Sequence, residues 1–95
     1  MLITAIYDVS SNRIRKRLSD RLKDAGLIRT QYSVFFGMLD NNRIDELALY
    51  AEEHLEEQDQ LYLIPIHRDD LNAARVIGKG FDDQLITDEL RTKVI

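Results

Sequence analysis

The stretch LITAIYDVSSNRIRKRL, residues 2–18, decides the fold because it joins a strand pattern to a helix pattern within a few residues. Residues 2–7 are almost wholly apolar, which predicts a central strand buried on both of its faces. The apolar run ends at Asp8, and either Ser11 or Asn12 can cap the helix that follows. The strand therefore delivers a carboxylate to its carboxyl end, directly before a basic helix.

Two helices are indicated by apolar residues at helical spacing. The stripe of the first helix consists of Ile14, Leu18, Leu22 and Ala25. Gly26 can adopt the left-handed conformation that ends a helix. The second helix, which has an acidic outer face, is predicted to begin at Asn41 or Asn42.

Three further strands are predicted from β-branched and aromatic residues. Residues 27–39, LIRTQYSVFFGML, show no helical period and predict two short antiparallel strands with a break near residues 31–33. Residues 60–66, QLYLIPI, predict another strand. Pro65 cannot donate a hydrogen bond to a neighbouring strand, so we expect it at a strand end or a sheet edge.

The resulting order β-α-β-β-α-β predicts an α+β, ferredoxin-like fold, in which two helices lie on one face of a four-stranded antiparallel sheet. We expect one domain over residues 1–95, with a core at residues 1–66 and a C-terminal extension at residues 67–95. Residues 75–77 can add a short strand to this extension. Because the fold serves many unrelated functions, the function has to be argued from particular residues.

Charge is distributed unevenly along the chain. The net charge is −4, yet residues 11–31 contain seven basic and only two acidic residues. This segregation indicates a basic surface for a polyanion on an acidic body, although a solvated, arginine-rich helix face is the alternative. The expected nucleic-acid-binding residues are Arg13, Arg15, Lys16, Arg17 and Arg29.

Several classes of site are excluded. The chain has no cysteine, which rules out disulfides, thiolate metal sites and a cysteine nucleophile, and fits a cytoplasmic protein. No apolar run approaches the roughly 20 residues that cross a bilayer, and the first residues lack the order of a signal peptide, so we expect no membrane partner. Phosphate-binding glycine motifs and the HExxH zinc motif are also absent.

Asp8 is the residue whose placement indicates chemistry. A carboxylate at the end of a buried strand is open to solvent and ligands, although Asp8 or Ser10 could instead cap the first helix. One carboxylate holds Mg²⁺ only loosely, but a residue near the axis of a two-fold dimer meets its own copy. Two Asp8 side chains could hold one hydrated Mg²⁺, which could activate water for attack on a phosphodiester.

The segments YDVS (residues 7–10), GLIRTQYSVFFG (residues 26–37) and LYLIPI (residues 61–66), with the basic helix between the first two, resemble the CRISPR-associated Cas2 family. The resemblance spans residue 2 to about residue 66. It implies a ferredoxin-like homodimer with Mg²⁺-dependent endonuclease activity on RNA or double-stranded DNA. It also implies partnership with the CRISPR integrase, in which the dimer bridges two integrase dimers and helps to hold foreign DNA for spacer acquisition. The alternative is a non-catalytic, DNA-binding adaptor.

The resemblance assigns roles by position. Asp8 matches the metal-binding aspartate, which we expect to be catalytic, and Arg15 and Arg17 match the basic pair of the first helix. These two arginines point in different directions on a helix, so at most one can face a metal directly. Arg29 matches a basic residue that precedes the QYSVF segment. The expected supporting residues are Tyr7, Ser10, Ser33 and Phe35.

Some assignments keep an alternative. Tyr7, Tyr32 and Phe35 would pack in any such sheet, so each can equally be a core residue. Phe36 stands where relatives often have an acidic residue, which could alter packing at a surface or an interface. In the family the region beyond residue 66 often adds a strand to the partner's sheet, so we expect a strand near residues 75–77 to be exchanged between the two chains.

Overall fold

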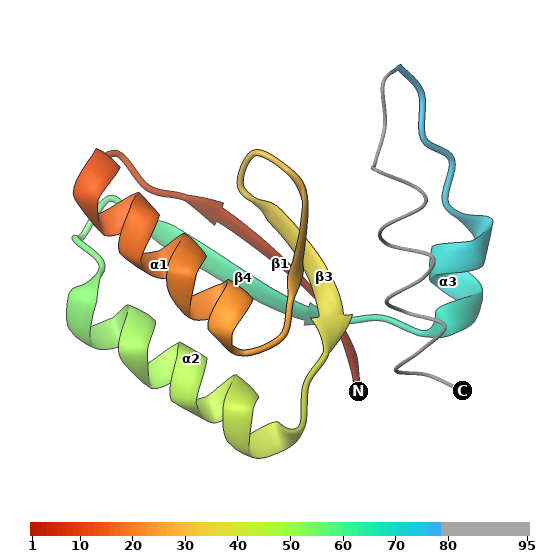
Figure 1. Ribbon diagram of the computed structural model, residues 1–95, viewed down its shortest axis with the longest axis horizontal. Coiled ribbons are helices and arrows are strands. Elements are labelled where there is room, and N and C mark those ends of the chain that lie inside the picture. The colour runs from red at the N-terminus through yellow and green to blue at the C-terminus, as the bar shows by residue number, and fades with distance from the viewer. Residues whose placement is uncertain (79–95) are drawn as a thin grey trace.

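The computed structural model describes residues 1–78 and shows a four-stranded sheet with two long helices on one side (Figure 1). The elements are β1 (Leu2–Asp8), α1 (Asn12–Asp24), β2 (Ile28–Gln31), β3 (Val34–Met38), α2 (Asn41–His54), β4 (Gln60–Pro65) and α3 (Arg68–Ala73). The strands lie in the order β2-β3-β1-β4, and every neighbouring pair is antiparallel. The predicted ferredoxin-like arrangement is confirmed.

The two faces of the sheet have different surroundings. The covered face packs against α1 and α2 and carries Ile3, Ala5, Tyr7 and Phe35, all buried. The open face, on the other side of β1 and β4, carries Ile6, Asp8, Gln60, Tyr62 and Ile64, all exposed. No helix formed by residues 1–78 packs on the open face. The expectation that residues 2–7 are buried on both faces is therefore wrong at Ile6, whereas Asp8 is exposed as expected.

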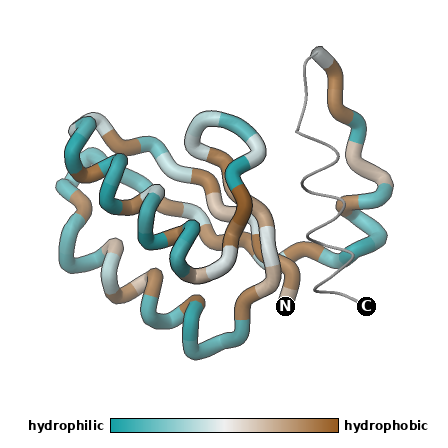
Figure 2. The backbone as a smooth tube through the Cα atoms, in the orientation of Figure 1, coloured by the Kyte–Doolittle hydropathy of each residue, from teal (hydrophilic) through white to brown (hydrophobic). Residues whose placement is uncertain are grey.

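The core lies between the covered face and the two long helices. Its largest fully buried side chains are Phe35, Ile3, Leu18 and Leu22. The predicted stripe of α1 is confirmed, because Leu18 and Leu22 are buried while Ile14 and Ala25 are half-buried against the same cluster. Hydropathy follows this arrangement, with hydrophobic residues along the strands and hydrophilic residues on much of the two long helices (Figure 2).

Side-chain caps fix where the helices begin. The Ser11 hydroxyl accepts a hydrogen bond from the backbone N–H of Ile14, so neither Asp8 nor Ser10 caps α1. Gly26 has a φ of 102° at the end of this helix, as predicted. The second helix begins at Asn41, but its cap is Asp40, whose carboxylate accepts from the backbone N–H of Arg43.

A tight turn at Tyr32 and Ser33 separates β2 from β3, within the predicted break. Ser33 has a φ of 66°, a left-handed conformation that few residues other than glycine adopt. Its carbonyl oxygen accepts a hydrogen bond from the backbone N–H of Tyr7, at 3.0 Å. The turn is therefore tied to the carboxyl end of β1.

Gly37 in β3 allows a close approach of two segments. A Cβ atom there would lie 2.8 Å from Cδ2 of Leu27 and 3.1 Å from the carbonyl oxygen of Gly26. A side chain at this position would push against the end of the loop that follows α1.

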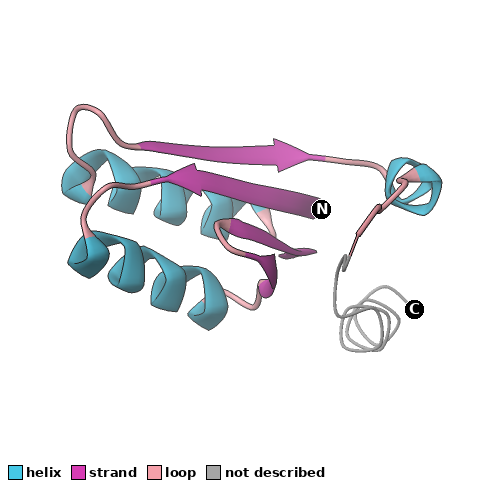
Figure 3. Ribbon diagram, turned by 90° about the horizontal axis from the view of Figure 1, so that it is seen from above, coloured by secondary structure: helices cyan, strands magenta, loops and turns pink. Residues whose placement is uncertain are grey.

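The chain after β4 differs from the expectation. The short helix α3 was not predicted, and it lies beyond the end of the sheet, apart from α1 and α2 (Figure 3). Residues 75–77 form no strand within the single described chain, so the predicted strand is absent there and its exchange with a second copy stays a prediction. Residues 79–95, the larger part of the proposed extension, lie outside the described residues. None of the described helices is both long and apolar enough to span a bilayer.

Candidate functional site

Asp8 lies on the open face, at the last position of β1. The antiparallel register places it opposite Gln60, and places Ile6 opposite Tyr62. Ile6, Tyr62 and Ile64 are 36%, 52% and 42% exposed, so an apolar strip runs beside the carboxylate. Single exposed apolar residues are ordinary, but a row of them on one sheet face marks a surface that packs against something else.

The carboxylate of Asp8 forms no hydrogen bond or ion pair with residues 1–78, so no described group competes with a ligand for it. The neighbouring Gln60 is engaged, because its Oε1 accepts a hydrogen bond from the Tyr62 hydroxyl at 2.5 Å. Within the described chain no three histidine, aspartate or glutamate side chains gather as a metal site. Residues 1–78 of one chain therefore supply a single carboxylate here, which is half of the two-carboxylate site expected for a dimer.

The arginines of α1 differ in what they contact. Arg15 donates one hydrogen bond from Nη1 to the carbonyl oxygen of Val9, at 3.1 Å, and another from Nη2 to Oδ1 of Asn12. Its guanidinium is thus held at the residue that follows Asp8. Arg13 and Arg17 are exposed, and their guanidiniums form no hydrogen bond or ion pair with the described residues. Among the arginines of α1, these two are available to a polyanion.

Lys16 and Arg29 are engaged away from Asp8. Lys16 forms an ion pair with Asp20 at 3.0 Å, and this hydrogen bond lowers the pKa of the Asp20 carboxyl. Arg29 donates from Nη2 to the Ser19 hydroxyl at 2.7 Å, and its guanidinium carbon lies 5.3 Å from the centre of the Phe35 ring. Both cations sit on the helix side, so the structure does not bring Arg29 to the open face with Asp8.

Three of the expected supporting residues lie in the core or in a turn and not on the open face beside Asp8. Tyr7 and Phe35 are buried on the covered face, with their ring centres 6.2 Å apart, so they are core residues on the opposite side of the sheet from Asp8. Ser33 lies in the β2–β3 turn rather than in a strand. None of these three side chains shares the open face with Asp8.

Ser10, the fourth, takes part in a contact that the sequence did not reveal. Its backbone N–H and its hydroxyl both donate to Oδ1 of Asp59, at 3.2 and 3.3 Å. The other oxygen of Asp59 accepts from the backbone N–H of Glu56 at 3.0 Å. The bond from Glu56, and next those from Ser10, lower the pKa of the Asp59 carboxyl. We call this the Ser10–Asp59 clasp; it joins the segment after Asp8 to the segment before Gln60.

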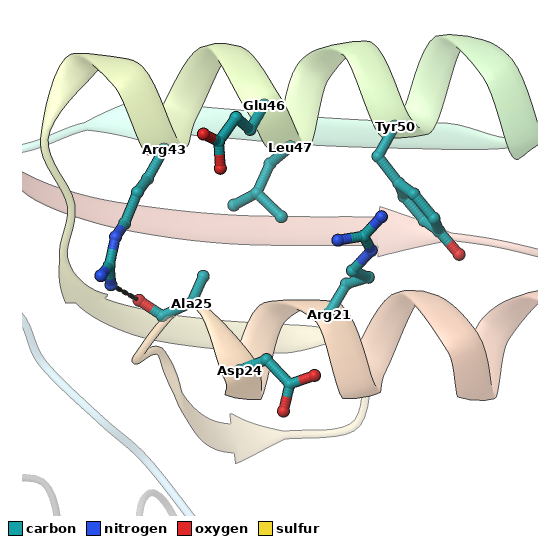
Figure 4. A pocket seen from close by; sticks show the side chains of 7 residues that line it. All are labelled: Arg21, Asp24, Ala25, Arg43, Glu46, Leu47 and Tyr50. Carbon is teal, nitrogen blue, oxygen red and sulfur yellow. Dashed lines mark hydrogen bonds between the residues drawn. The ribbon is translucent and has the colours of Figure 1, made fainter.

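A hollow of about 250 Å³ lies between α1 and α2, on the side of the helices (Figure 4). Its lining residues are Arg21, Asp24, Ala25, Arg43, Glu46, Leu47 and Tyr50. Arg21 lies over the ring of Tyr50 at 4.5 Å, and Arg43 donates to the carbonyl oxygen of Ala25 at 3.0 Å. Because its charges are of both signs and its arginines are engaged, this hollow offers a polyanion little attraction, and it lies on the face away from Asp8.

Comparisons with known proteins agree on one family. The family model described as CRISPR associated protein Cas2 matches residues 1–74. Over 72 residues the chain is 33% identical to the CRISPR-associated endoribonuclease Cas2 of Desulforudis audaxviator, covering 75% of this chain and 68% of that relative. A hypothetical protein from Thermus thermophilus has a similar crystal structure, with a TM-score of 0.70 and 31% identity over 83% of this chain and 92% of that one. The crystal structure of Streptococcus pyogenes Cas2 at pH 6.5 matches with a TM-score of 0.71 over 82% of this chain and 100% of that one, and at 17% identity it supports the fold alone.

Proposed function

Because the chain belongs to the CRISPR-associated protein Cas2 family, we propose that it is a metal-dependent endonuclease that hydrolyses phosphodiester bonds as a homodimer. Relatives carry the name endoribonuclease, and RNA or double-stranded DNA is the proposed substrate. The observation that supports the proposal most directly is the position of Asp8, an exposed carboxylate without a partner among residues 1–78, beside an apolar strip. We further propose that the dimer works in spacer acquisition with the CRISPR integrase.

The open face supports the choice of a second copy as partner. A two-fold axis through this face would lay the strip of Ile6, Tyr62 and Ile64 against its own copy, removing apolar surface from water. Asp8 lies at the end of the same strip, so an axis near that end brings two Asp8 carboxylates together. Symmetry then supplies the second ligand that one chain lacks.

The residues present fit a hard divalent cation. Mg²⁺ takes oxygen ligands, keeps several waters and is commonly held by one or two carboxylates. When bound, Mg²⁺ would polarise a phosphoryl oxygen and lower the pKa of a coordinated water. Asp8 would hold the ion, and the unengaged guanidiniums of Arg13 and Arg17 would hold the phosphates of the substrate backbone. Arg15, anchored on the Val9 carbonyl, would keep the segment after Asp8 in place.

A second candidate is a non-catalytic adaptor that grips nucleic acid and bridges two integrase dimers. It draws on the fact that Arg13 and Arg17 are available on α1 whether or not Asp8 holds a metal. Residues 1–78 of each chain also offer only one carboxylate at the site, which leaves hydrolysis dependent on the exact geometry of the dimer.

The test is the Asp8→Asn substitution, which keeps the shape of the side chain and removes its charge. We expect the rate of Mg²⁺-dependent cleavage of RNA or duplex DNA to fall about 100-fold or more, because the ion loses both of its carboxylates in the dimer. Asp45→Asn, at an exposed position of α2, is the matched control and should cleave normally. Cleavage by Asp8→Asn at the unsubstituted rate would refute the enzyme; lost cleavage with intact spacer acquisition would favour the adaptor.

A further inference from the structure

Tyr32 is the most exposed aromatic side chain of the described chain, with 91% of its surface in solvent. It lies in the β2–β3 turn, and within residues 1–78 its ring contacts no other ring and its hydroxyl forms no hydrogen bond. Of the three aromatic residues that could equally have been core, Tyr7 and Phe35 are buried and Tyr32 is not. An aromatic ring that gains nothing from the fold is available to a partner outside the chain.

The backbone places the turn that carries this ring at the carboxyl end of β1, where Asp8 lies. In the antiparallel register of β1 and β3, Ile6 pairs with Val34, and the backbone N–H of Tyr7 donates to the carbonyl of Ser33. The register ends there, so the turn that contains Ser33 and Tyr32 lies at the carboxyl end of β1, the end at which Asp8 is the last residue. Figure 1 shows the β2–β3 turn standing near the carboxyl end of β1. The left-handed conformation of Ser33 and its bond to Tyr7 hold the turn in this position.

The same end of the sheet gathers the other groups that a nucleic acid would need. The guanidinium of Arg15 is bound to Val9, the residue after Asp8, and the free cation Arg13 lies in the first turn of α1. An exposed aromatic ring beside cations is the combination that binds unpaired nucleotides, because any base can stack on the ring while the cations hold its phosphates.

We propose that Tyr32 stacks on an unpaired base of the nucleic-acid strand whose backbone lies at Asp8. The inference rests on the proposed function, since it takes the substrate to be a nucleic acid. In a closed duplex the faces of the bases are covered by their neighbours, so Tyr32 would favour single strands, loops or frayed ends over blunt duplex. Stacking needs the ring and not the hydroxyl, so phenylalanine would serve equally well.

Because the chain contains no tryptophan, Tyr32→Trp places the only tryptophan of each chain at the turn, where it can be excited apart from the tyrosines. We expect its emission to be quenched by single-stranded RNA or DNA oligonucleotides of about twelve nucleotides, and to be nearly unchanged by a blunt duplex of the same length. Separate RNA and DNA titrations show which strand is preferred. Quenching by neither single strand would overturn the proposal.

Affinity gives an independent readout. Tyr32→Ala should weaken single-strand binding about tenfold while changing blunt-duplex binding less than twofold, and Tyr32→Phe should bind as the unsubstituted protein does. Gln31→Ala, at the end of β2 directly before the turn, and Leu49→Ala, an exposed apolar residue of α2, are the controls expected to change nothing. Unchanged single-strand affinity in Tyr32→Ala would refute the stacking role.

The binding measurements are made in EDTA with Asp8→Asn as the background, so they do not depend on hydrolysis. A chain that stacks bases but never cleaves would contradict the proposed enzyme and leave this inference standing. A chain that cleaves normally with Tyr32→Ala and binds single strands unchanged would do the reverse. Loss of the dimer in Tyr32→Ala without nucleic acid would assign the ring to a contact between copies and overturn the inference.

Discussion

The two faces of the sheet are built from alternate residues of the same strands, yet within residues 1–78 helices cover only one of them. The covered face buries Ile3, Ala5 and Phe35 completely beneath α1 and α2. The open face leaves Ile6, Tyr62 and Ile64 between about one-third and one-half exposed, with Asp8 at the end of the row. Packing on the covered face stabilises the folded chain. The open face is where a partner can pack and a ligand can bind.

The largest expected effect falls on the covered face. Phe35→Ala removes a fully buried ring that touches Tyr7 and lies near Arg29, and should lower the free energy of unfolding by about 3–5 kcal/mol. Urea titrations at two protein concentrations measure it, and the loss should appear at both. Ile6→Ala, from the open face, is the contrast, with a smaller loss that grows smaller still on dilution. Equal losses at Phe35 and Ile6 would mean that the two faces are not different.

A charge on the open face should separate the copies and leave each chain folded. Ile64→Asp places a carboxylate in the apolar strip, and we expect the dimer dissociation constant to rise at least about 30-fold, corresponding to about 2 kcal/mol. Sedimentation velocity measures the change, with circular dichroism to show that the fold is kept. Leu49→Asp, on the outer face of α2, is the matched control. A dimer that survives Ile64→Asp would place the contact between copies elsewhere.

A third effect concerns the unengaged arginines of α1, the helix that follows the carboxyl end of β1. Replacing both Arg13 and Arg17 by alanine should reduce the slope of log affinity against log salt by about two, because each lost phosphate contact removes about one released counterion. Lys16→Ala serves as the control, since Lys16 is already paired with Asp20. A slope that falls only in Lys16→Ala would show that the engaged cations, and not the free ones, meet the phosphates.

The smallest effect is a pH dependence at the Ser10–Asp59 clasp. The pKa of Asp59 is lowered in the folded state, below the ordinary value of 3.8, so the clasp stabilises the fold at higher pH and this contribution is lost as pH falls through the folded pKa. We therefore expect the difference in melting temperature between the unsubstituted protein and Asp59→Ala to shrink as pH falls from 7 to about 3. A difference that stays constant over this range would show that the clasp owes nothing to the charge of Asp59.

The sequence predicted the fold and the position of Asp8 at the end of the first strand. It did not predict which side chains lie near Asp8. A continuous apolar run identified β1, helical spacing identified α1, and the length of residues 27–39 indicated the strand break, because each is a local pattern. The same local view could not show that Asp59, 49 residues away, bonds to Ser10, or that Tyr62 shares a face with Asp8. Pairing across the sheet decides both. The helix α3 has six residues, too few for a helical period to be visible.

Residue types alone also could not separate the aromatic residues or the arginines. Tyr7 and Tyr32 look alike in sequence, yet strand parity buries one and a left-handed Ser33 leaves the other at a turn. Arg29 was grouped with the cations of α1 by charge, but its register opposite Phe35 directs it to the covered face. Alternation along a strand settles such cases only once the partner strands are known.

The alternation of β1 also limits how this chain can vary through evolution. Exchange of one apolar residue for another at positions 2–7 keeps the inward and outward sequence intact. An insertion or deletion of a single residue would rotate the remainder of the strand by half a turn, bringing Tyr7 into water and the carboxylate of Asp8 into the interior. Apolar substitutions along β1 are therefore tolerated as the sequence evolves. The number of residues that precede Asp8 is under much tighter selection.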